Sequence, residues 1–160
     1  MDVKTKVLES QRKIIDSLAG CELHIGLLYE KYASLFPAMN KSWLGLADAE
    51  KTHSNLLKTM HHILDKGSIF HNLGKFNDEV IQSMIDLLDE SLKKVNDPNF
   101  TSSDAINTAL KIESSIMDSH FYDVVSSDAP EFKIIAERLS SDTKKHVQAV
   151  RSHFHEQSPA

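Results

Sequence analysis

Apolar residues recur at three- and four-residue steps along most of the chain, a spacing typical of amphipathic helices. In the first segment, about residues 5–36, the apolar stripe is Ile15, Leu18, Ile25, Tyr29, Tyr32 and Phe36. In the second, about residues 41–66, it is Trp43, Leu46, Ala47, Leu57, Met60 and Leu64. Pro37 and Gly67 follow these segments, where helix-ending residues are expected. The pattern predicts two long helices joined by a short turn.

Three further periodic segments follow, at about residues 78–95, 104–125 and 129–155. The first has Asn77 as its expected cap and carries the apolar residues Val80, Ile81, Met84, Ile85, Leu88, Leu92 and Val95. Ser102 or Ser103 is the expected cap of the next helix. Asp128 with Glu131 resembles a capping box at the start of the last. Since no convincing strand alternation accompanies these segments, we predict an all-α protein.

Four of the five predicted helices are long, about 22 to 32 residues, and span roughly 33–48 Å. Four helices of this length with apolar stripes indicate a four-helix bundle. We expect a single domain over residues 1–160, with one helix pair at about 5–66 and another at about 104–155. The shorter helix, about 78–95, belongs to the connection between the pairs, on the outside or at one end of the bundle.

Composition and charge argue against some classes of function but indicate no particular one. The 160 residues are 41% hydrophobic and 26% charged, an ordinary globular balance, and the net charge is −5 with no basic cluster. Nucleic-acid binding, which needs a basic face, is therefore not expected. No apolar run approaches the ~20 residues that a membrane span needs, and the N-terminal residues contain no apolar core of signal-peptide length. With a single cysteine, Cys21, these features predict a cytoplasmic protein with no membrane partner.

Ionisable residues interrupt the stripes of the four long helices near mid-length. They are Glu22 in the first, Glu50 and His53 in the second, Glu113 in the fourth, and Asp142 and His146 in the last. Taken singly, such a glutamate usually lies at the edge of its stripe, and such a histidine is usually a hydrogen-bonded core residue. Taken together, they favour a metal site, because burying an unpaired carboxylate costs several kcal/mol. Oxygen and imidazole ligands suit iron, manganese or zinc.

The spacing supports the same interpretation. Glu50 and His53 form Glu-x-x-His, and residues three apart lie on one helical face. Di-iron bundles take one Glu from each of two helices and one Glu-x-x-His from each of the other two. Glu113 and His146 repeat the arrangement in the second half, except that Thr143 stands where its second Glu would begin.

The run ELHIGLLYEKYASLFPAMNKSWLGLADAEKTH resembles the first helix pair of rubrerythrin-like members of the ferritin-like superfamily. The residues that carry the resemblance are Glu22, Tyr29, Trp43, Glu50 and His53. The run ALKIESSIMDSHFYDVVSSDAPEFKIIAERLSSDTKKH resembles the second pair more loosely. The resemblance covers nearly all the chain except the third helix. It implies a ferritin-like antiparallel four-helix bundle with an additional short helix in the connection between helix pairs.

The resemblance also implies roles for the interrupting residues. Glu22 and Glu113 would be terminal carboxylate ligands, Glu50 a bridging carboxylate, and His53 and His146 nitrogen ligands, one on each metal. The cofactor would be one or two iron ions, with manganese or zinc as alternatives. The activity would be that of an oxidoreductase acting on peroxide or dioxygen.

Tyr29, Tyr32 and His120 are the candidates to orient the ligands. Related bundles pair, so a homodimer is a further expectation.

Two departures from the family pattern keep several outcomes open. Thr143 cannot act as a bridging carboxylate, and Asp142 could replace it only with a shifted geometry. Rubredoxin-type cysteine pairs are absent from the sequence, so redox turnover would need an external electron donor. One outcome is two metals with a thinned ligand set, and another is one metal on Glu22, Glu50 and His53, with or without Glu113. The third outcome is a metal-free relic that serves as a structural or interaction bundle.

Overall fold

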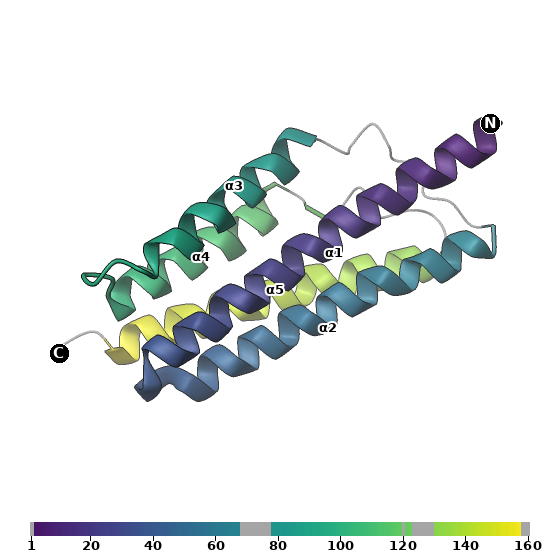
Figure 1. Cartoon of the computed structure of the whole chain (residues 1–160). Helices are drawn as coiled ribbons and strands as arrows, with labels where there is room; N and C mark the ends of the chain where they lie inside the picture. Colours follow the sequence, from purple (N-terminus) through teal and green to yellow (C-terminus); the bar gives the residue numbers. More distant parts are fainter. Residues whose placement is uncertain (1, 68–77, 120, 123–129, 158–160) are drawn as a thin grey trace.

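The computed structural model describes residues 2–67, 78–119, 121–122 and 130–157, with side chains of the last helix described to residue 152. Its elements are α1 (Val3–Leu35), the short 3-10 helix η1 (Pro37–Met39), α2 (Asn40–Asp65), α3 (Asp78–Lys94), α4 (Ser102–Asp118) and α5 (Pro130–Gln157). Within the described ranges there is no strand. The prediction of an all-α protein is therefore confirmed, and the helices form an elongated bundle (Figure 1).

The helix ends differ from the predictions at α4. Thr101, not Ser102 or Ser103, caps its start, and Thr101 and Asp104 form a reciprocal capping box. The expected end near residue 125 is wrong, because α4 ends at Asp118 and Ser119 is its C-cap. The backbone N–H of Phe121 then bonds the carbonyl of Ile116 at 3.2 Å. This turn lets the rings of residues 121 and 122 pack into the core instead of continuing along the helix.

Helices α1 and α2 form a closely packed antiparallel pair (Figure 1). At one end, Arg12 pairs with Asp65. Near the middle, the hydroxyl of Ser54 donates to the carbonyl of Ala19 at 2.9 Å. Gly67 has φ of 95°, a left-handed conformation that favours glycine, so its predicted role at the end of α2 is confirmed.

Gly26 allows α1 to approach α2 closely. A Cβ built on Gly26 would lie 3.2 Å from the carbonyl oxygen of Ala47 and 3.6 Å from the Cβ of Glu50. At Gly45, in contrast, no described residue places an atom within 4 Å of such a Cβ. The absence of a side chain at Gly26 therefore brings Glu50 close to α1.

Gly26→Ala and Gly45→Ala form a matched pair of variants. At Gly45, where a Cβ has open space, alanine should raise the free energy of unfolding by about 0.5–1 kcal/mol, because it restricts the unfolded chain and favours helix. At Gly26, overpacking against backbone should offset that gain, leaving the protein about 1–2 kcal/mol less stable than Gly45→Ala. Urea unfolding of both variants measures the difference. Equal free energies of unfolding in the two variants would show that α1 and α2 can move apart at Gly26 without loss of stability.

The second half completes the bundle. Helix α4 packs on α5, α5 also contacts α2, and α3 lies against α1 and beside α4 (Figure 1). Ile81, Met84 and Leu88 provide the buried face of α3. The shorter helix expected at about residues 78–95, between the two pairs in sequence, is therefore α3 (Asp78–Lys94).

An aromatic cluster fills the core near the turn between α1 and α2. The ring of Trp43 lies 5.5 Å from that of Tyr29 and 5.0 Å from that of Tyr32. Tyr32 also stacks on Phe100, which precedes α4, at 5.7 Å. These ring contacts join both helix pairs at one end of the molecule.

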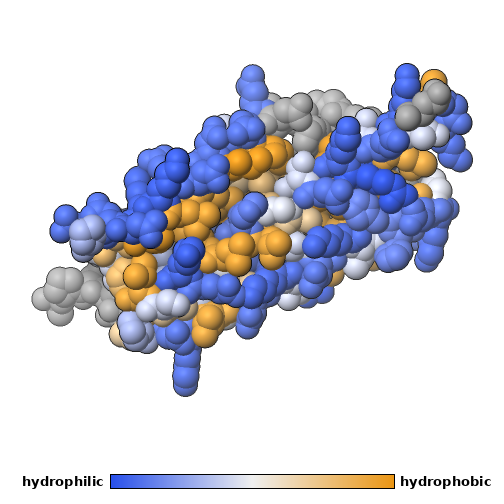
Figure 2. All heavy atoms as spheres, viewed as in Figure 1, coloured by the Kyte–Doolittle hydropathy of each residue, from blue (hydrophilic) through white to orange (hydrophobic). Residues whose placement is uncertain are grey.

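The surface between α1 and α3 is hollowed and apolar (Figure 2). Leu27, Leu35, Leu92 and Val95 contribute to its walls, and its volume is about 480 Å³. None of the buried ionisable residues belongs to its walls. Among the described helices, none combines the length and apolar character needed to cross a lipid bilayer.

Candidate metal centre

Five of the predicted site residues converge inside the bundle. Glu22 comes from α1, Glu50 and His53 from α2, Glu113 from α4 and His146 from α5. The exposed fraction is 7% for His146 and at most 1% for the other four. We call these five residues the Glu–His cluster. Its members lie in a helical core, where an ionised group needs a partner of opposite charge.

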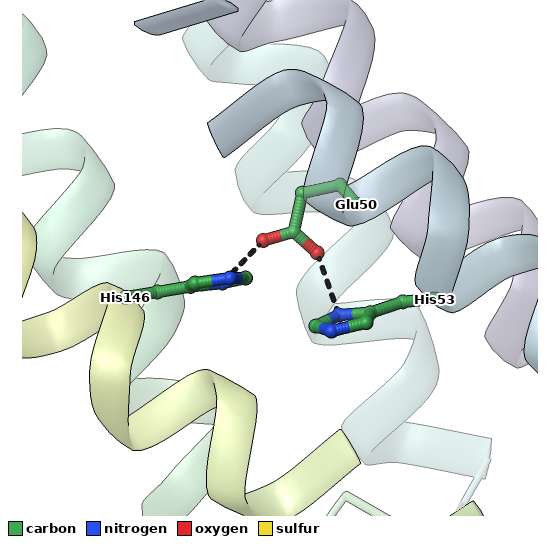
Figure 3. A group of neighbouring side chains, drawn as sticks. All are labelled: Glu50, His53 and His146. Carbon is green, nitrogen blue, oxygen red and sulfur yellow. Dashed lines mark ion pairs between the residues drawn. The ribbon is translucent and has the colours of Figure 1, made fainter. Parts of the chain in front are cut away.

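Glu50 lies between the two imidazoles (Figure 3). Its Oε1 is 2.8 Å from Nδ1 of His146, and its Oε2 is 3.3 Å from Nδ1 of His53. The two rings lie nearly parallel, with centroids 5.2 Å apart. Each carboxylate oxygen of Glu50 therefore faces a different histidine, as a bridging ligand would.

The other two carboxylates flank this centre. Oε2 of Glu22 lies 3.9 Å from Nδ1 of His53, and Oε2 of Glu113 lies 3.6 Å from Nδ1 of His146. Each imidazole thus has Glu50 and one further carboxylate near its Nδ1. The cluster consists of two similar halves that share Glu50.

Several polar atoms of the Glu–His cluster are buried and make no hydrogen bond within the described residues, and all but one of them contact one another only as ion pairs at 2.8–3.9 Å. They are both carboxylate oxygens of Glu22, Oε1 of Glu50, Oε2 of Glu113, and Nδ1 of both His53 and His146. An unsatisfied buried polar atom costs about 1–3 kcal/mol, so native proteins seldom leave them without a partner. Six such atoms in one region fit a cation that would bind them together.

The donor set and its spacing suit a transition metal. One ligand atom each from Glu50, His53 and His146 can be chosen so that all three lie within 4.8 Å of one another. Ligands at about 2.0–2.2 Å from one ion lie at most about 4.4 Å apart, so a small adjustment would close the set. Carboxylates with imidazoles suit iron, manganese and zinc.

The cluster also sets the protonation of its own members. Burial alone would lower the pKa of His53, but the carboxylates of Glu22 and Glu50 raise it to about 11. Burial likewise opposes protonation of His146, whereas Glu113 and Glu50 raise its pKa to about 10. Burial, and then the charge of Glu50, raises the pKa of Glu22 well above its usual range. Without metal, protons therefore neutralise the cluster at neutral pH.

The candidates for orienting the ligands fall in different places. The Tyr29 hydroxyl donates to Oε1 of Glu113 at 2.8 Å, which leaves Oε2 of that carboxylate facing His146. Burial and the neighbouring Glu113 raise the pKa of Tyr29, so its hydroxyl keeps its proton. Tyr32 belongs instead to the aromatic cluster, and its hydroxyl interacts with Thr108. His120 lies outside the described residues.

Asp142 contacts the opposite side of a ligand ring. Its Oδ2 lies 3.2 Å from Nε2 of His53, whereas Nδ1 of that ring faces the carboxylates. Arg138 and Lys145 flank the same carboxylate at 3.7 and 3.8 Å. In this arrangement Asp142 is not among the converging atoms, and it would orient His53 and increase its basicity.

Removing the Asp142 carboxylate tests this role. Asp142→Ala should weaken metal binding by about tenfold, because the imidazole of His53 loses the group that fixes its orientation. Titration with Zn²⁺ against a competing chelator measures the affinity. Asp48→Ala, which removes an exposed carboxylate from α2, serves as the control. Equal affinities in the two variants would contradict the role.

Thr143 occupies the position where the second half lacks a carboxylate. The residue is buried, and its hydroxyl donates to the carbonyl of Leu139 at 2.8 Å. The hydroxyl proton of Thr143 is therefore engaged in a hydrogen bond within α5. The cluster has three carboxylates where the full pattern of four-helix di-iron sites has four.

The contact between Asp142 and His53 was not expected from sequence. The signal was present, since Asp142 lies four residues before His146 and hence on a neighbouring face of α5. Which side of which histidine it reaches depends on how α5 packs on α2, and periodicity does not contain that information.

Comparisons of the chain with protein-family models, with curated proteins and with solved structures gave no match. The interpretation of the Glu–His cluster therefore rests on its geometry and on the chemistry of its residues.

Proposed function

We propose that this chain is a ferritin-like, rubrerythrin-like bundle that binds one or two transition-metal ions, iron first, in the Glu–His cluster. The observation that carries the proposal is the position of Glu50, whose two oxygens face the Nδ1 atoms of His53 and His146 in the core. A carboxylate shared by two buried imidazoles, each with a further carboxylate beside it, fits a binuclear site. The unsatisfied atoms of the cluster support the same proposal.

Each half of the cluster would hold one ion. His53 and Glu22 would bind the first, His146 and Glu113 the second, and Glu50 would bridge them. Bound iron would supply a Lewis acid and an electron relay toward peroxide or dioxygen. The chain's own residues would exclude water by their burial, while the Tyr29 hydroxyl would hold Glu113 in place.

Redox turnover would require electrons from outside the chain. Cys21 is the only cysteine in the sequence, and its side chain is buried. Burial, together with the charge of Glu22, raises the pKa of its thiol to about 12, so it stays protonated. A separate electron donor is thus part of the proposed oxidoreductase function.

Metal analysis tests the proposal directly. The purified, untagged chain is incubated with ferrous iron, and its metal content is measured by plasma mass spectrometry. About two irons per chain would support a binuclear site, and about one would support a site centred on Glu50 and His53. His53→Ala should reduce the content, whereas His62→Ala, at an exposed position of α2, should not. Absence of iron, manganese and zinc from the unaltered chain would refute metal binding.

A second candidate is a metal-free bundle that serves a structural or protein-interaction role. Two observations favour it: Thr143 supplies no carboxylate, and protons can neutralise the cluster. Glu50→Ala distinguishes the candidates through stability. In a metal-binding protein, the variant should lose the stabilisation that added metal provides. In a metal-free bundle, metal should have no effect, and removal of a buried carboxylate can stabilise the fold.

A further inference from the structure

A small cavity between α4 and α5 lies beside the Glu–His cluster. Its volume is about 210 Å³, and its walls include Ile116 and Thr143. Ile116 lies three residues beyond Glu113 on α4, and Thr143 lies three residues before His146 on α5. Residues three apart share a helical face, so the cavity is about one helical turn from the second half of the cluster.

With two divalent ions bound, the Glu–His cluster would have one excess positive charge, which one monoanion would balance. Its three carboxylates, those of Glu22, Glu50 and Glu113, carry three negative charges when ionised. The Asp142 carboxylate on the far side of His53 is already paired with Arg138 and Lys145. Two divalent ions would bring four positive charges, and Thr143 supplies none of the missing negative charge. In a buried site an unbalanced charge is costly, so the second ion would bind weakly without another anion. A monoanion next to Thr143 would remove the imbalance.

The cavity contains groups that suit such an anion. The Tyr122 side chain is 3% exposed, and its buried hydroxyl oxygen has no hydrogen-bond partner among the residues that the structure describes. Ser140 and Lys144, both exposed, also line the cavity and would provide a hydroxyl donor and a positive charge. At about 30 Å³ per water molecule, the volume corresponds to roughly seven waters. A small carboxylate, with two or three heavy atoms in addition to its carboxyl carbon, would fit in this volume and leave room for some water.

We propose that this cavity binds a small monocarboxylate, of the size of formate or acetate, which supplies the carboxylate that Thr143 lacks. Its binding would favour occupation of the metal position formed by Glu113 and His146. The hydroxyl of Tyr122 and the ammonium of Lys144 would hold the anion. This inference rests on the proposed metal-binding function and deepens it, since it assigns an external ligand to that site.

Titration with Co²⁺, whose visible absorption reports its ligands, tests the inference on the full chain. The titration is made with sodium acetate and, separately, with acetamide, a neutral molecule of similar shape, at constant ionic strength. Acetate should raise the affinity for the second Co²⁺ by about tenfold and change its absorption spectrum, because a carboxylate joins the ligands. Acetamide should do neither.

Two variants locate the effect. Thr143→Glu supplies the carboxylate within the chain, so it should bind two Co²⁺ without acetate and show no response to acetate. Tyr122→Phe should reduce the acetate effect severalfold, since the anion loses a donor. Equal responses to acetate and acetamide, or a full acetate response in Thr143→Glu, would overturn the inference. If Co²⁺ binds but acetate has no effect, this inference is overturned and the proposed metal-binding function stands. If Co²⁺ does not bind at all, both are overturned.

Discussion

Glu50→Gln is expected to weaken transition-metal binding by at least about a hundredfold relative to the unaltered chain. Glutamine keeps the size of the side chain but replaces one carboxylate oxygen with an amide nitrogen, which is a donor and not a ligand. The oxygens of Glu50 face Nδ1 of His53 and Nδ1 of His146, so either amide orientation removes one half of the bridge. The loss of charge weakens the binding of both ions.

A Zn²⁺ titration against a competing chelator measures this loss. Glu9→Gln is the matched control, because it makes the same chemical change at an exposed position of α1. Circular dichroism of the metal-free variants shows whether the helices persist. An affinity for Glu50→Gln within a few-fold of that for Glu9→Gln would show that Glu50 does not bind the metal. The function would then shift to the metal-free bundle.

The helices and the cluster could be predicted from sequence because both depend on local spacing. The apolar stripes predicted the described helices to within a few residues, apart from the end of α4. The interruptions at Glu22, Glu50 and Glu113 fall on core-facing positions, and a core-facing carboxylate near the middle of a long helix must meet the neighbouring helices. Convergence therefore follows from periodicity together with burial.

What could not be predicted depends on contacts between helices. Helix α4 ends at Asp118, and Phe121 and Tyr122 beyond it are buried. The apolar periodicity of the sequence predicted that the helix would continue through these two residues. Which nitrogen of His53 contacts Asp142 depends on the packing of α5 on α2. The cavity beside Thr143 exists because side chains from two helices leave space between them, and no pattern within one helix records that space.

The metal affinity of the Glu–His cluster is expected to rise steeply with pH. The pKa values of His53 and His146, about 11 and about 10, mean that both imidazoles carry protons at neutral pH when metal is absent. Metal must displace these protons, because the same Nδ1 atoms would bind the ion. Each released proton makes affinity rise about tenfold per pH unit below the pKa, so two give about a hundredfold. The raised pKa of Glu22 acts in the same direction.

Calorimetric titration with Zn²⁺ at about pH 6, 7 and 8, in buffers of different ionisation enthalpy, counts the protons released. Release of about two protons would assign both imidazoles to the metal, and release of about one would assign a single half of the cluster. The metal-free chain should show the opposite dependence. The pKa of each histidine is higher in the folded than in the unfolded state, so its stabilisation is complete below about pH 6.5 and is lost as the pH rises through 10 to 11. An affinity that does not change with pH would show that neither histidine binds the ion, and the stability of the metal-free chain at high pH would then show whether they serve only as its buried counter-charges.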